Sequence, residues 1–520
     1  MTSISKRVAG LSLFVVATVG AQVRRAPITA EGVVRGDSAG AVIAPAIYGQ
    51  FAEHLGRGIY DGVWVGPDSP IPNTRGFRND VIAALRAIKV PVVRWPGGCF
   101  ADDYHWRDGI GPRASRPVRV NVLWGGVEES NAVGTHEFFD LAEQIGAKTY
   151  VAGNVGTGTP VEMARWLEYL TSPTRSTLAN ERRRNGRETP YTVDLFGVGN
   201  ETWGCGGNMT AEHYADLYRN FGEFVRSPQS PRIVKVASGA NSDDYHWTEV
   251  LMQRAAGQMD AMSMHYYTVP TGNWDKKGAA TSTDQSLWMS TMVQALRMEE
   301  LVSRHSAIMD KFDPKKRVAL YVDEWGVWHD VEPGTNPGFL YQQNTLRDAV
   351  VAALTLNIFH AHADRVRLAA IAQMVNVLQA MILTDHDKMI LTPTYHVFEM
   401  YTVFQGATQL PVTLDAPRYV LGDASVPGIS ASAARGADGA VYVALVNLNP
   451  AQASSLALRL PGVQATKVTA RILTAESLGA HNTVVAPTAI APVAFTGATL
   501  RAGVLRVELP AKSVVVLTLR

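Results

Sequence analysis

The chain has 520 residues, of which 46% are hydrophobic and 18% charged, a composition typical of a globular protein with a large buried core. Its formal net charge of +1 gives no long-range field that would attract nucleic acid or an anionic membrane surface, so we expect neither as a partner. The two cysteines, Cys99 and Cys205, are too few for a disulfide scaffold.

The N-terminal segment has the pattern of a secretory signal. Lys6 and Arg7 precede the apolar run LSLFVVATVGA, in which Val19 and Ala21 fit the minus-three and minus-one positions of a cleavage site. We therefore predict a signal peptide over residues 1–21 and an exported protein, periplasmic or extracellular. The apolar run is shorter than the roughly 20 residues that span a bilayer, and no later stretch qualifies, so no membrane insertion is expected after cleavage.

Residues 22–45 are expected to form a strand segment. They contain the stretch EGVVRGDSAGAVI, which is strand-like. We expect this segment to join a β-sandwich formed mainly by the C-terminal part of the chain, which makes that domain discontinuous.

Residues 46–404 are predicted to form a (β/α)₈ barrel. Short apolar runs alternate with longer stretches of helical periodicity, the pattern of repeated βα units around a parallel sheet. The predicted strands are 47–53, 90–96, 148–154, 195–201, 232–239, 261–267, 318–325 and 368–376. Helices are predicted at 79–89, 135–146, 160–170, 211–221 and 345–359, among others. A doubly wound sheet is the alternative, but no glycine-rich phosphate loop supports it.

After Phe404 the pattern changes to short strands with alternating polar and apolar residues. The predicted strands are 439–449, 454–462, 466–474, 503–510 and 513–520. Turn residues such as Asp438 and Gly439 separate strands of this kind. We therefore predict an antiparallel β-sandwich over residues 405–520.

Polar and aromatic residues at the strand ends are the candidates for function, because the active site of a (β/α)₈ barrel lies at the C-terminal ends of its strands. They are Glu53, His54, Arg94, Trp95, Asn154, Asn200, Glu201, His265, Tyr267, Glu324, Trp325, Gln373 and Asn376. Glu201 and Glu324 follow the fourth and seventh strands, on opposite sides of the barrel mouth. Glycoside hydrolysis needs such a pair, one acid to protonate the leaving oxygen and one carboxylate to meet the anomeric carbon.

Side chains around this pair suit a neutral sugar. Asn200, next to Glu201, is placed to hydrogen-bond a sugar hydroxyl. Trp203, Trp325 and Trp328 offer flat faces to the C–H surfaces of a sugar ring.

Six stretches in consistent order resemble glycoside hydrolase family 51, the α-L-arabinofuranosidases. They are GQFAEHLGRGIYDG, VVRWPGGCFADDYHWRDGIGPR, VGNETWGCGG, SMHYYT, YVDEWGVW and AQMVNVLQAM. The resemblance runs from about Tyr48 to Phe404, and the following sandwich is similar to the second domain of the family. It implies a retaining, exo-acting enzyme, without a cofactor, that removes terminal α-L-arabinofuranosyl groups from arabinoxylan, arabinan or their oligosaccharides. It also leaves a homo-oligomer open, because members often form hexamers.

The resemblance also implies roles for the site residues. Glu201 would be the acid/base and Glu324 the nucleophile. Sugar-binding positions of the family are matched by Glu53, Arg94, Asn200, His265, Tyr267 and Gln373, with Trp124 and Trp328 near the pocket rim. These roles require a raised pKa for Glu201, from apolar walls and the charge of Glu324, while hydrogen bonds from Arg94 and Tyr267 keep Glu324 ionised.

Two positions depart from the family pattern. Cys99 stands at a substrate-binding position where many members have asparagine, and Gly326 follows the EW pair where asparagine is common. Cys99 follows the second strand and Cys205 comes four residues after Glu201, so both are expected at the barrel mouth. We predict a disulfide between them, with two free thiols lining the pocket as the alternative.

Other functions are weighed against this interpretation. An endo-acting β-glucanase or xylanase on the same barrel is the alternative, which an open cleft would favour. A carbohydrate-binding protein without activity is disfavoured, because both glutamates are present. The stretch DDYHW occurs at 102–106 and 243–247, but no metal-ligand spacing accompanies it, so no metal site is predicted.

Overall fold

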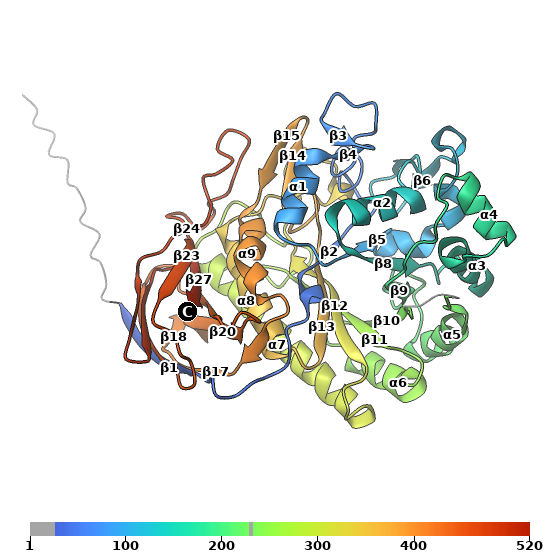
Figure 1. The fold of residues 1–520 in the computed structure, drawn as a ribbon. Helices are drawn as coiled ribbons and strands as arrows, with labels where there is room; N and C mark the ends of the chain where they lie inside the picture. Colours follow the sequence, from blue (N-terminus) through green and yellow to red (C-terminus); the bar gives the residue numbers. More distant parts are fainter. Residues whose placement is uncertain (1–26, 228–231) are drawn as a thin grey trace, which may run out of the picture.

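The computed structural model describes residues 27–227 and 232–520 (Figure 1). The predicted signal peptide at 1–21 lies outside the described residues. Among the helices of the described ranges, none combines the length and the apolar character needed to cross a bilayer.

A closed parallel barrel forms the centre of the chain and confirms the predicted (β/α)₈ fold. Its strands are β2 (Gly49–Phe51), β5 (Val92–Trp95), β8 (Lys148–Gly153), β9 (Leu195–Val198), β10 (Val234–Asn241), β11 (Ala261–Thr268), β12 (Ala319–Val327) and β13 (Val366–Ile371). β13 pairs with β2 and closes the ring. All eight strands fall on the predicted apolar runs, although the first is preceded by a 3₁₀ turn, η1 (Pro45–Tyr48).

Helices surround the barrel (Figure 1). They are α1 (Asn79–Ala87), α2 (Thr135–Ile145), α3 (Pro160–Thr171), α4 (Thr177–Arg184), α5 (Ala211–Phe224), α6 (Tyr245–Ala255), α7 (Gln285–Phe312), α8 (Leu346–Ala361) and α9 (Pro393–Tyr401). Local sequence explains where they begin: before α3, the Thr159 hydroxyl accepts a hydrogen bond from the amide of Glu162, and Pro160 occupies the first turn. The five predicted helices are α1, α2, α3, α5 and α8, with ends within three residues.

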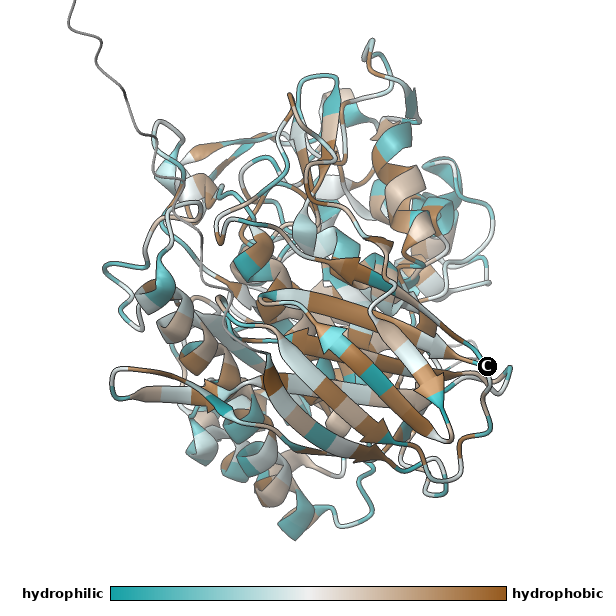
Figure 2. Ribbon diagram, turned by 90° about the vertical axis from the view of Figure 1, so that its left-hand side faces the viewer, coloured by the Kyte–Doolittle hydropathy of each residue, from teal (hydrophilic) through white to brown (hydrophobic). Residues whose placement is uncertain are grey.

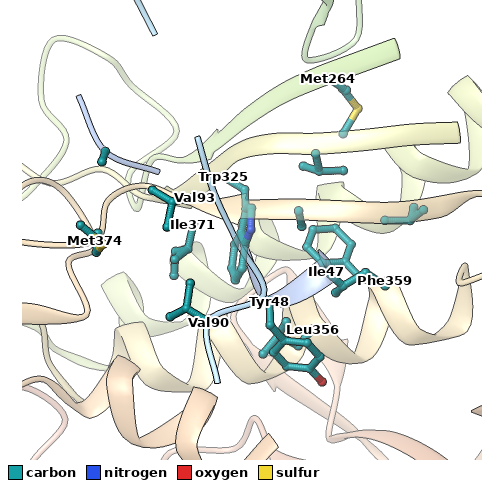
Figure 3. Close-up of a cluster of buried hydrophobic side chains, with 14 of the residues drawn as sticks. Ile47, Tyr48, Val90, Val93, Met264, Trp325, Leu356, Phe359, Ile371 and Met374 are labelled. Atoms are coloured by element: carbon teal, nitrogen blue, oxygen red, sulfur yellow. The ribbon is translucent and has the colours of Figure 1, made fainter. Parts of the chain in front are cut away.

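Two hydrophobic layers hold the barrel together. Inside, the lower part is filled by Val92, Tyr150, Leu195, Val236, Ala261, Ala319, Tyr321 and Leu368. Outside, strand side chains pack against the helices, as Figure 3 shows for Trp325 and Ile371 near Leu356 and Phe359 of α8. Because the lower interior is filled, the polar groups at the C-terminal strand ends form the floor of an opening rather than a channel.

The C-terminal part forms the predicted sandwich of two sheets. One sheet has the order β17 (Val412–Asp415), β1 (Ile28–Val34), β22 (Ser454–Arg459), β26 (Val504–Leu509), β25 (Ala498–Arg501). The other has the order β16 (Thr408–Leu410), β20 (Ile429–Arg435), β21 (Val441–Asn447), β27 (Ser513–Leu519), β23 (Val468–Leu473), β24 (Val493–Ala494). Polar and apolar residues alternate along these strands (Figure 2), and their apolar side chains form a separate core.

The N-terminal strand β1 belongs to this sandwich. It pairs antiparallel with β17 and parallel with β22, so one pairing of an otherwise antiparallel domain is parallel. The chain crosses from the sandwich to the barrel at η1 and returns after η6 (Thr402–Phe404). We keep 404/405 as the proposed division between the two domains.

The two domains also contain short hairpins and 3₁₀ turns. The hairpins are β3 (Asn73–Thr74) with β4 (Phe77–Arg78), β6 (Arg119–Asn121) with β7 (Val127–Glu129), β14 (Ile382–Asp385) with β15 (Lys388–Leu391), and β18 (Arg418–Leu421) with β19 (Ala424–Pro427). The remaining 3₁₀ turns are η2 (Cys99–Asp103), η3 (Trp106–Gly109), η4 (Arg113–Ser115) and η5 (Pro337–Phe339).

The sandwich packs on the helical side of the barrel. The indole of Trp288 in α7 donates to the carbonyl of Leu448 at 2.8 Å, and this side chain is fully buried. In α8, His360 Nδ1 lies 2.7 Å from the hydroxyl of Ser432. Apolar residues of both domains form one continuous cluster, so the sandwich supports the barrel away from its mouth.

Candidate active site

Glu201 stands on a tight turn directly after β9. Its backbone is left-handed, with φ of 40°, and Gly199 just before it has φ of 84°. Such a conformation is strained for a residue with a side chain and persists where the surroundings fix it. Here the indole of Trp203 donates to the carbonyl of Gly239 at 3.0 Å, tying the turn to β10.

Asp102 connects three loops of the barrel mouth: its own loop after β5 and the loops after β8 and β9. Its buried carboxylate accepts the amides of Val155 at 2.6 Å and Gly156 at 3.0 Å from the loop after β8, and that of Asn200 at 2.6 Å. Burial raises the pKa of Asp102 to about 7, against these hydrogen bonds. The first DDYHW copy therefore holds Asn200, and with it the Glu201 turn, in place.

Glu324 lies in β12 and receives two hydrogen bonds from the barrel wall. Arg94 Nη1 donates at 2.9 Å and the Tyr267 hydroxyl donates at 2.8 Å, the arrangement expected from the sequence. Donors of this kind stabilise the ionised form of a carboxylate. The backbone at Gly98 packs closely against Glu324. If residue 98 had a side chain, its Cβ atom would lie 2.6 Å from Glu324 Oε1.

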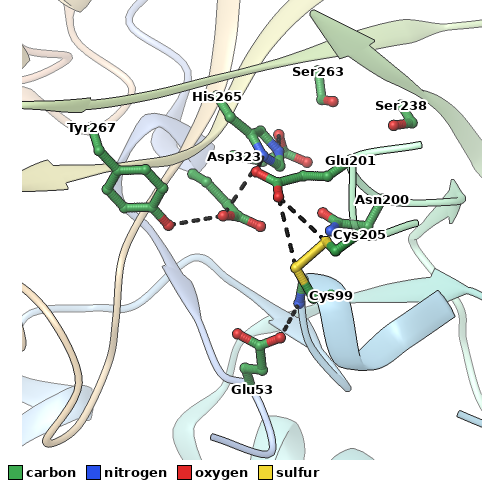
Figure 4. A network of polar contacts seen from close by, with 12 residues as sticks. Glu53, Cys99, Asn200, Glu201, Cys205, Ser238, Ser263, His265, Tyr267 and Asp323 are labelled. Carbon is green, nitrogen blue, oxygen red and sulfur yellow. Dashed lines mark hydrogen bonds and ion pairs between the residues drawn. A yellow bond between two sulfur atoms is a disulfide. The ribbon is translucent and has the colours of Figure 1, made fainter. Parts of the chain in front are cut away.

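His265 bridges the two glutamates. Its Nδ1 lies 2.8 Å from Glu201 Oε1 (Figure 4). The same nitrogen lies 3.6 Å from Glu324 Oε2. Burial lowers the pKa of His265, but the carboxylates of Glu324, Asp323 and Glu201 outweigh it and raise that pKa to about 10. Burial and the charge of Glu324 raise the pKa of Glu201, as the sequence led us to expect, against the opposing effect of His265.

Glu53, which follows β2, accepts hydrogen bonds from four donors. The amides of Gly98 and Phe100 donate to Oε1 at 3.1 and 3.0 Å, and the Trp124 indole donates to the same atom at 3.0 Å. Gln373 Nε2 donates to Oε2 at 3.1 Å. Burial and the charge of Glu324 raise the pKa of Glu53 to about 7. This side chain is therefore a fixed acceptor or donor for a ligand hydroxyl.

Two amide groups at the site have an unused atom. Arg94 donates to Asn200 Oδ1, while Asn200 Nδ2 is buried and has no hydrogen-bond partner among the described residues. Gln373 Oε1 is also buried and also has no hydrogen-bond partner among the described residues. Because buried polar atoms are normally paired, these two are available to a bound ligand.

A cavity of about 560 Å³ opens beside Glu201. Its lining includes Trp203, His265, Tyr267, Trp274 and Trp328. Trp274 is 54% exposed and meets Trp328 edge to face, with ring centroids 5.4 Å apart. The sequence pattern did not single out Trp274, since it lies in a loop after β11 rather than at a strand end.

Trp325 does not line the site, which corrects the expectation that it offers a face to a sugar. It is 1% exposed and packs edge to face against Phe359 and stacked over Phe398. Its position in β12 turns it toward the helices (Figure 3).

Cys99 and Cys205 are joined by a disulfide, with their Cα atoms 5.5 Å apart. The bond links η2 to the loop that carries Glu201 (Figure 4). Cys99 Sγ and Cys205 Sγ lie 3.7 and 3.4 Å from Glu201 Oε2. Because disulfide sulfurs carry no proton, these are packing contacts, and Cys99 has no thiol to offer a substrate.

Within residues 27–227 and 232–520, two groups of side chains have the spacing of metal ligands. One is Cys99, Glu201 and Cys205, whose sulfurs are already bonded to each other. The other is Glu201, His265 and Glu324, where His265 Nδ1 faces Glu201 as a hydrogen-bond partner. That the protein needs no metal and no cofactor stays a prediction.

Comparisons with known proteins agree with this geometry. Residues 84–286 match the model of the α-L-arabinofuranosidase 1 domain, and residues 323–513 match that of the α-L-arabinofuranosidase C-terminal domain. The chain is 49% identical to an intracellular exo-α-L-arabinofuranosidase of Bacteroides ovatus, over 94% of this chain and 95% of the relative.

Solved structures with the same architecture include two α-L-arabinofuranosidases. The glycoside hydrolase family 51 arabinofuranosidase of Xanthomonas axonopodis pv. citri is 56% identical, with a TM-score of 0.94, covering 95% of this chain and 100% of that one. The arabinose complex of the Thermotoga maritima α-L-arabinofuranosidase is 31% identical, with a TM-score of 0.82, covering 94% and 99%.

One of these comparisons corrects the prediction of export. The Bacteroides ovatus relative aligns over nearly the whole chain and is named intracellular, so the prediction of a secreted, periplasmic or extracellular protein is wrong. A short apolar run after two basic residues fits a leader, but that pattern by itself does not establish export.

Proposed function

The chain belongs to glycoside hydrolase family 51, the α-L-arabinofuranosidases, and on this premise we propose that Glu201 and Glu324 remove terminal α-L-arabinofuranosyl groups with retention of configuration. As a family member it is an exo-acting α-L-arabinofuranosidase. The choice of residues, the stereochemistry and the natural substrate are the parts proposed here.

The distance between the two glutamates carries the proposal. An oxygen of Glu201 and an oxygen of Glu324 lie within 4.8 Å of one another. Retaining glycosidases hold their carboxyl groups about 5–5.5 Å apart, whereas inverting enzymes need about 6.5–9.5 Å to admit a water molecule between carboxylate and sugar. The short separation supports direct attack on the sugar.

The two glutamates take different roles because their surroundings differ. Glu324, which accepts hydrogen bonds from Arg94 and Tyr267, attacks the anomeric carbon and forms a covalent glycosyl-enzyme as the leaving group departs. Glu201, whose pKa is raised by burial and by the charge of Glu324, donates its proton to the departing oxygen. In the second step Glu201 takes a proton from water, which attacks the anomeric carbon and releases Glu324.

The remaining contacts suit a small neutral sugar. Asn200 Nδ2 and Gln373 Oε1 have no partner among the described residues, and with the Glu53 carboxyl, which accepts from Gln373, they are available to hydroxyl groups. We place the leaving group in the cavity that Glu201 lines, with Trp274 and Trp328 in its wall. We therefore propose arabinose-containing oligo- or polysaccharides, such as arabinoxylan or arabinan, as substrates. The endo-acting β-glucanase or xylanase is not retained, because the chain belongs to an arabinofuranosidase family.

Hydrolysis of 4-nitrophenyl α-L-arabinofuranoside tests the proposal, beside the 4-nitrophenyl β-glucoside and β-xyloside. We expect turnover of the arabinofuranoside and loss of this turnover in Glu324→Ala. We expect 4-nitrophenol to be released from the β-glucoside and the β-xyloside only at background rate. Proton NMR of the first product formed should show the α-anomer. Formation of the β-anomer first would contradict retention, and activity that survives in Glu324→Ala would contradict the nucleophile.

A further inference from the structure

β12 carries a β-bulge at the catalytic strand end. On the neighbouring strand β11, Ser263 pairs with Tyr321 and His265 pairs with Glu324, so two steps along β11 match three along β12. The pairing with β13 shifts over the same stretch. A bulge of this kind re-aims a side chain. Here it lets Asp323 and Glu324, consecutive in the chain, both reach the inside of the barrel.

Asp323 is buried below the two glutamates and has partners from across the barrel. It is 1% exposed. The Tyr150 hydroxyl of β8 donates to its Oδ2 at 2.7 Å, and Arg94 Nε lies 3.7 Å from the same oxygen. Arg94 and His265 lower the pKa of Asp323 and outweigh its burial, so this side chain is a fixed negative charge.

The second oxygen of Asp323 faces His265. Oδ1 lies 3.2 Å from His265 Nε2, at ion-pair distance. It accepts no hydrogen bond from any other group among the described residues. The other ring nitrogen, Nδ1, lies 2.8 Å from Glu201 Oε1. The imidazole thus lies between a permanent carboxylate and the proposed acid/base (Figure 4).

We propose that Asp323 is a positioning residue: it keeps the His265 imidazole a cation and directs its Nδ1–H to Glu201. A carboxylate behind a histidine fixes both its protonation and its ring orientation. As Glu201 loses its proton to the leaving group, the carboxylate that forms then faces a positive charge at hydrogen-bond distance. The Asp323 side chain contacts Tyr150, Arg94 and His265 rather than the two reacting carboxyl groups.

The charged groups that face His265 come from three elements. Glu201 follows β9, Asp323 and Glu324 lie in β12, and Arg94 of β5 stands behind Glu324. In the part of the chain that the structure describes, the carboxylates outnumber the neighbouring cation, Arg94, which is why a protonated imidazole is favoured here despite burial.

Histidine protonation is measured directly in the intact protein labelled with ring ¹⁵N-histidine. The chain has 13 histidines, and the His265→Gln variant identifies the signals of His265 by difference. In the wild type we expect both ring nitrogens of His265 to carry protons at pH 8. In Asp323→Asn we expect deprotonation at a pH at least about one unit lower. A neutral imidazole in the wild type at pH 8 would overturn the proposal.

A double-mutant cycle tests whether Asp323 acts through His265. We expect Asp323→Asn to lower kcat/KM about 100-fold in the wild type, but less than about twofold in the His265→Gln background. Equal losses in both backgrounds would overturn the proposal, since they would mean that Asp323 acts through Arg94 or through folding. If Asp323→Asn does not fold, the wild-type titration decides alone.

A second buried carboxylate–histidine pair provides the matched control. Asp348 Oδ1 lies 2.8 Å from His329 Nε2, and both side chains are fully buried. We expect Asp348→Asn to lower the Tm while leaving the His265 titration unchanged. Because the inference rests on the proposed function, Glu201→Ala is assayed in parallel. Full activity in that variant would refute the proposed function, whereas the titration reports on Asp323 alone.

Discussion

The sulfur of Cys205 lies 3.4 Å from Oε2 of Glu201. The proposed acid thus has the disulfide on one oxygen and His265 Nδ1 on the other, at 2.8 Å. Its own backbone is left-handed, so the turn depends on neighbours to keep its shape. The bond from Cys205 to Cys99 fixes that turn against η2.

Loss of this disulfide should lower both stability and activity. The bond spans 106 residues, and a native disulfide contributes about 2–4 kcal/mol to the free energy of unfolding. We expect the double variant Cys99→Ala, Cys205→Ala to have a lower Tm and a several-fold lower kcat. Thermal denaturation and arabinofuranoside turnover measure the two effects.

Reductant applied to the wild type is the control for that variant. The chain has only two cysteines, and Cys205 is exposed, so thiol titration should count no thiols before reduction and two after it. Reduced wild type should then match the double variant in Tm. Two thiols in the untreated protein would mean that the bond is absent.

Removal of the proposed nucleophile should abolish turnover and allow rescue by a small anion. In Glu324→Ala we expect kcat to fall on the order of 10⁵-fold. Azide can enter the space left by the carboxylate and attack the same carbon, giving the glycosyl azide of inverted configuration. Rescue without inversion would be inconsistent with Glu324 as nucleophile. Glu53→Ala is the matched control, since it removes a nearby glutamate that should not be rescued by azide.

Removal of the proposed acid, Glu201, should affect substrates according to their leaving group. A positioned general acid contributes about 10²–10⁴-fold, and an activated aryl group departs without a proton. We therefore expect Glu201→Ala to lose most activity on arabino-oligosaccharides and much less on 2,4-dinitrophenyl α-L-arabinofuranoside. Comparison of kcat/KM on the two substrates measures this difference. Losses of equal size would exclude Glu201 as the acid.

The pH dependence of kcat/KM should show an alkaline limb well above the ordinary range of a glutamate. The acid must be protonated to act, so activity is lost as the pH rises through the pKa of Glu201. Burial and the charge of Glu324 raise that pKa above the usual value of about 4.3. We therefore expect activity on poor leaving groups to persist to a higher pH than the titration of an unperturbed glutamate would allow. An alkaline limb that coincides with the ordinary titration of a glutamate would contradict a raised pKa.

The barrel and most of its site residues could be predicted from sequence because parallel strands leave a strong signal. Each strand is an apolar run, and the polar residue that ends it is conspicuous: Glu53, Arg94, Glu201 and His265 were found in this way. In the structure these four lie around one opening.

The bulge in β12 explains what could not be predicted. The run VALYVDEW is apolar up to its end, so it gives no sign of which side chains face inward. Ala319 and Tyr321 fill the barrel, and strict alternation would then place Asp323 and Trp325 inside and Glu324 outside. One extra residue brings Glu324 in and turns Trp325 out. Trp325 was misassigned for this reason, because pairing register is a property of the neighbouring strands. Asp323, which alternation already places inside, was missed because only residues at the strand ends were taken as candidates.

The indole of Trp288 should be a measurable part of the contact between barrel and sandwich. It is fully buried in α7 and donates to the carbonyl of Leu448 at 2.8 Å. Trp288→Phe keeps an aromatic ring but leaves that carbonyl without its partner, which costs about 1–3 kcal/mol. Trp274→Phe is the matched control: Trp274 is 54% exposed, so this substitution should leave the Tm unchanged.

Since apolar residues of both domains form one cluster, calorimetry of Trp288→Phe should show a single transition at lower temperature. Two separated transitions in the wild type would mean that barrel and sandwich unfold independently, and that this contact supports neither.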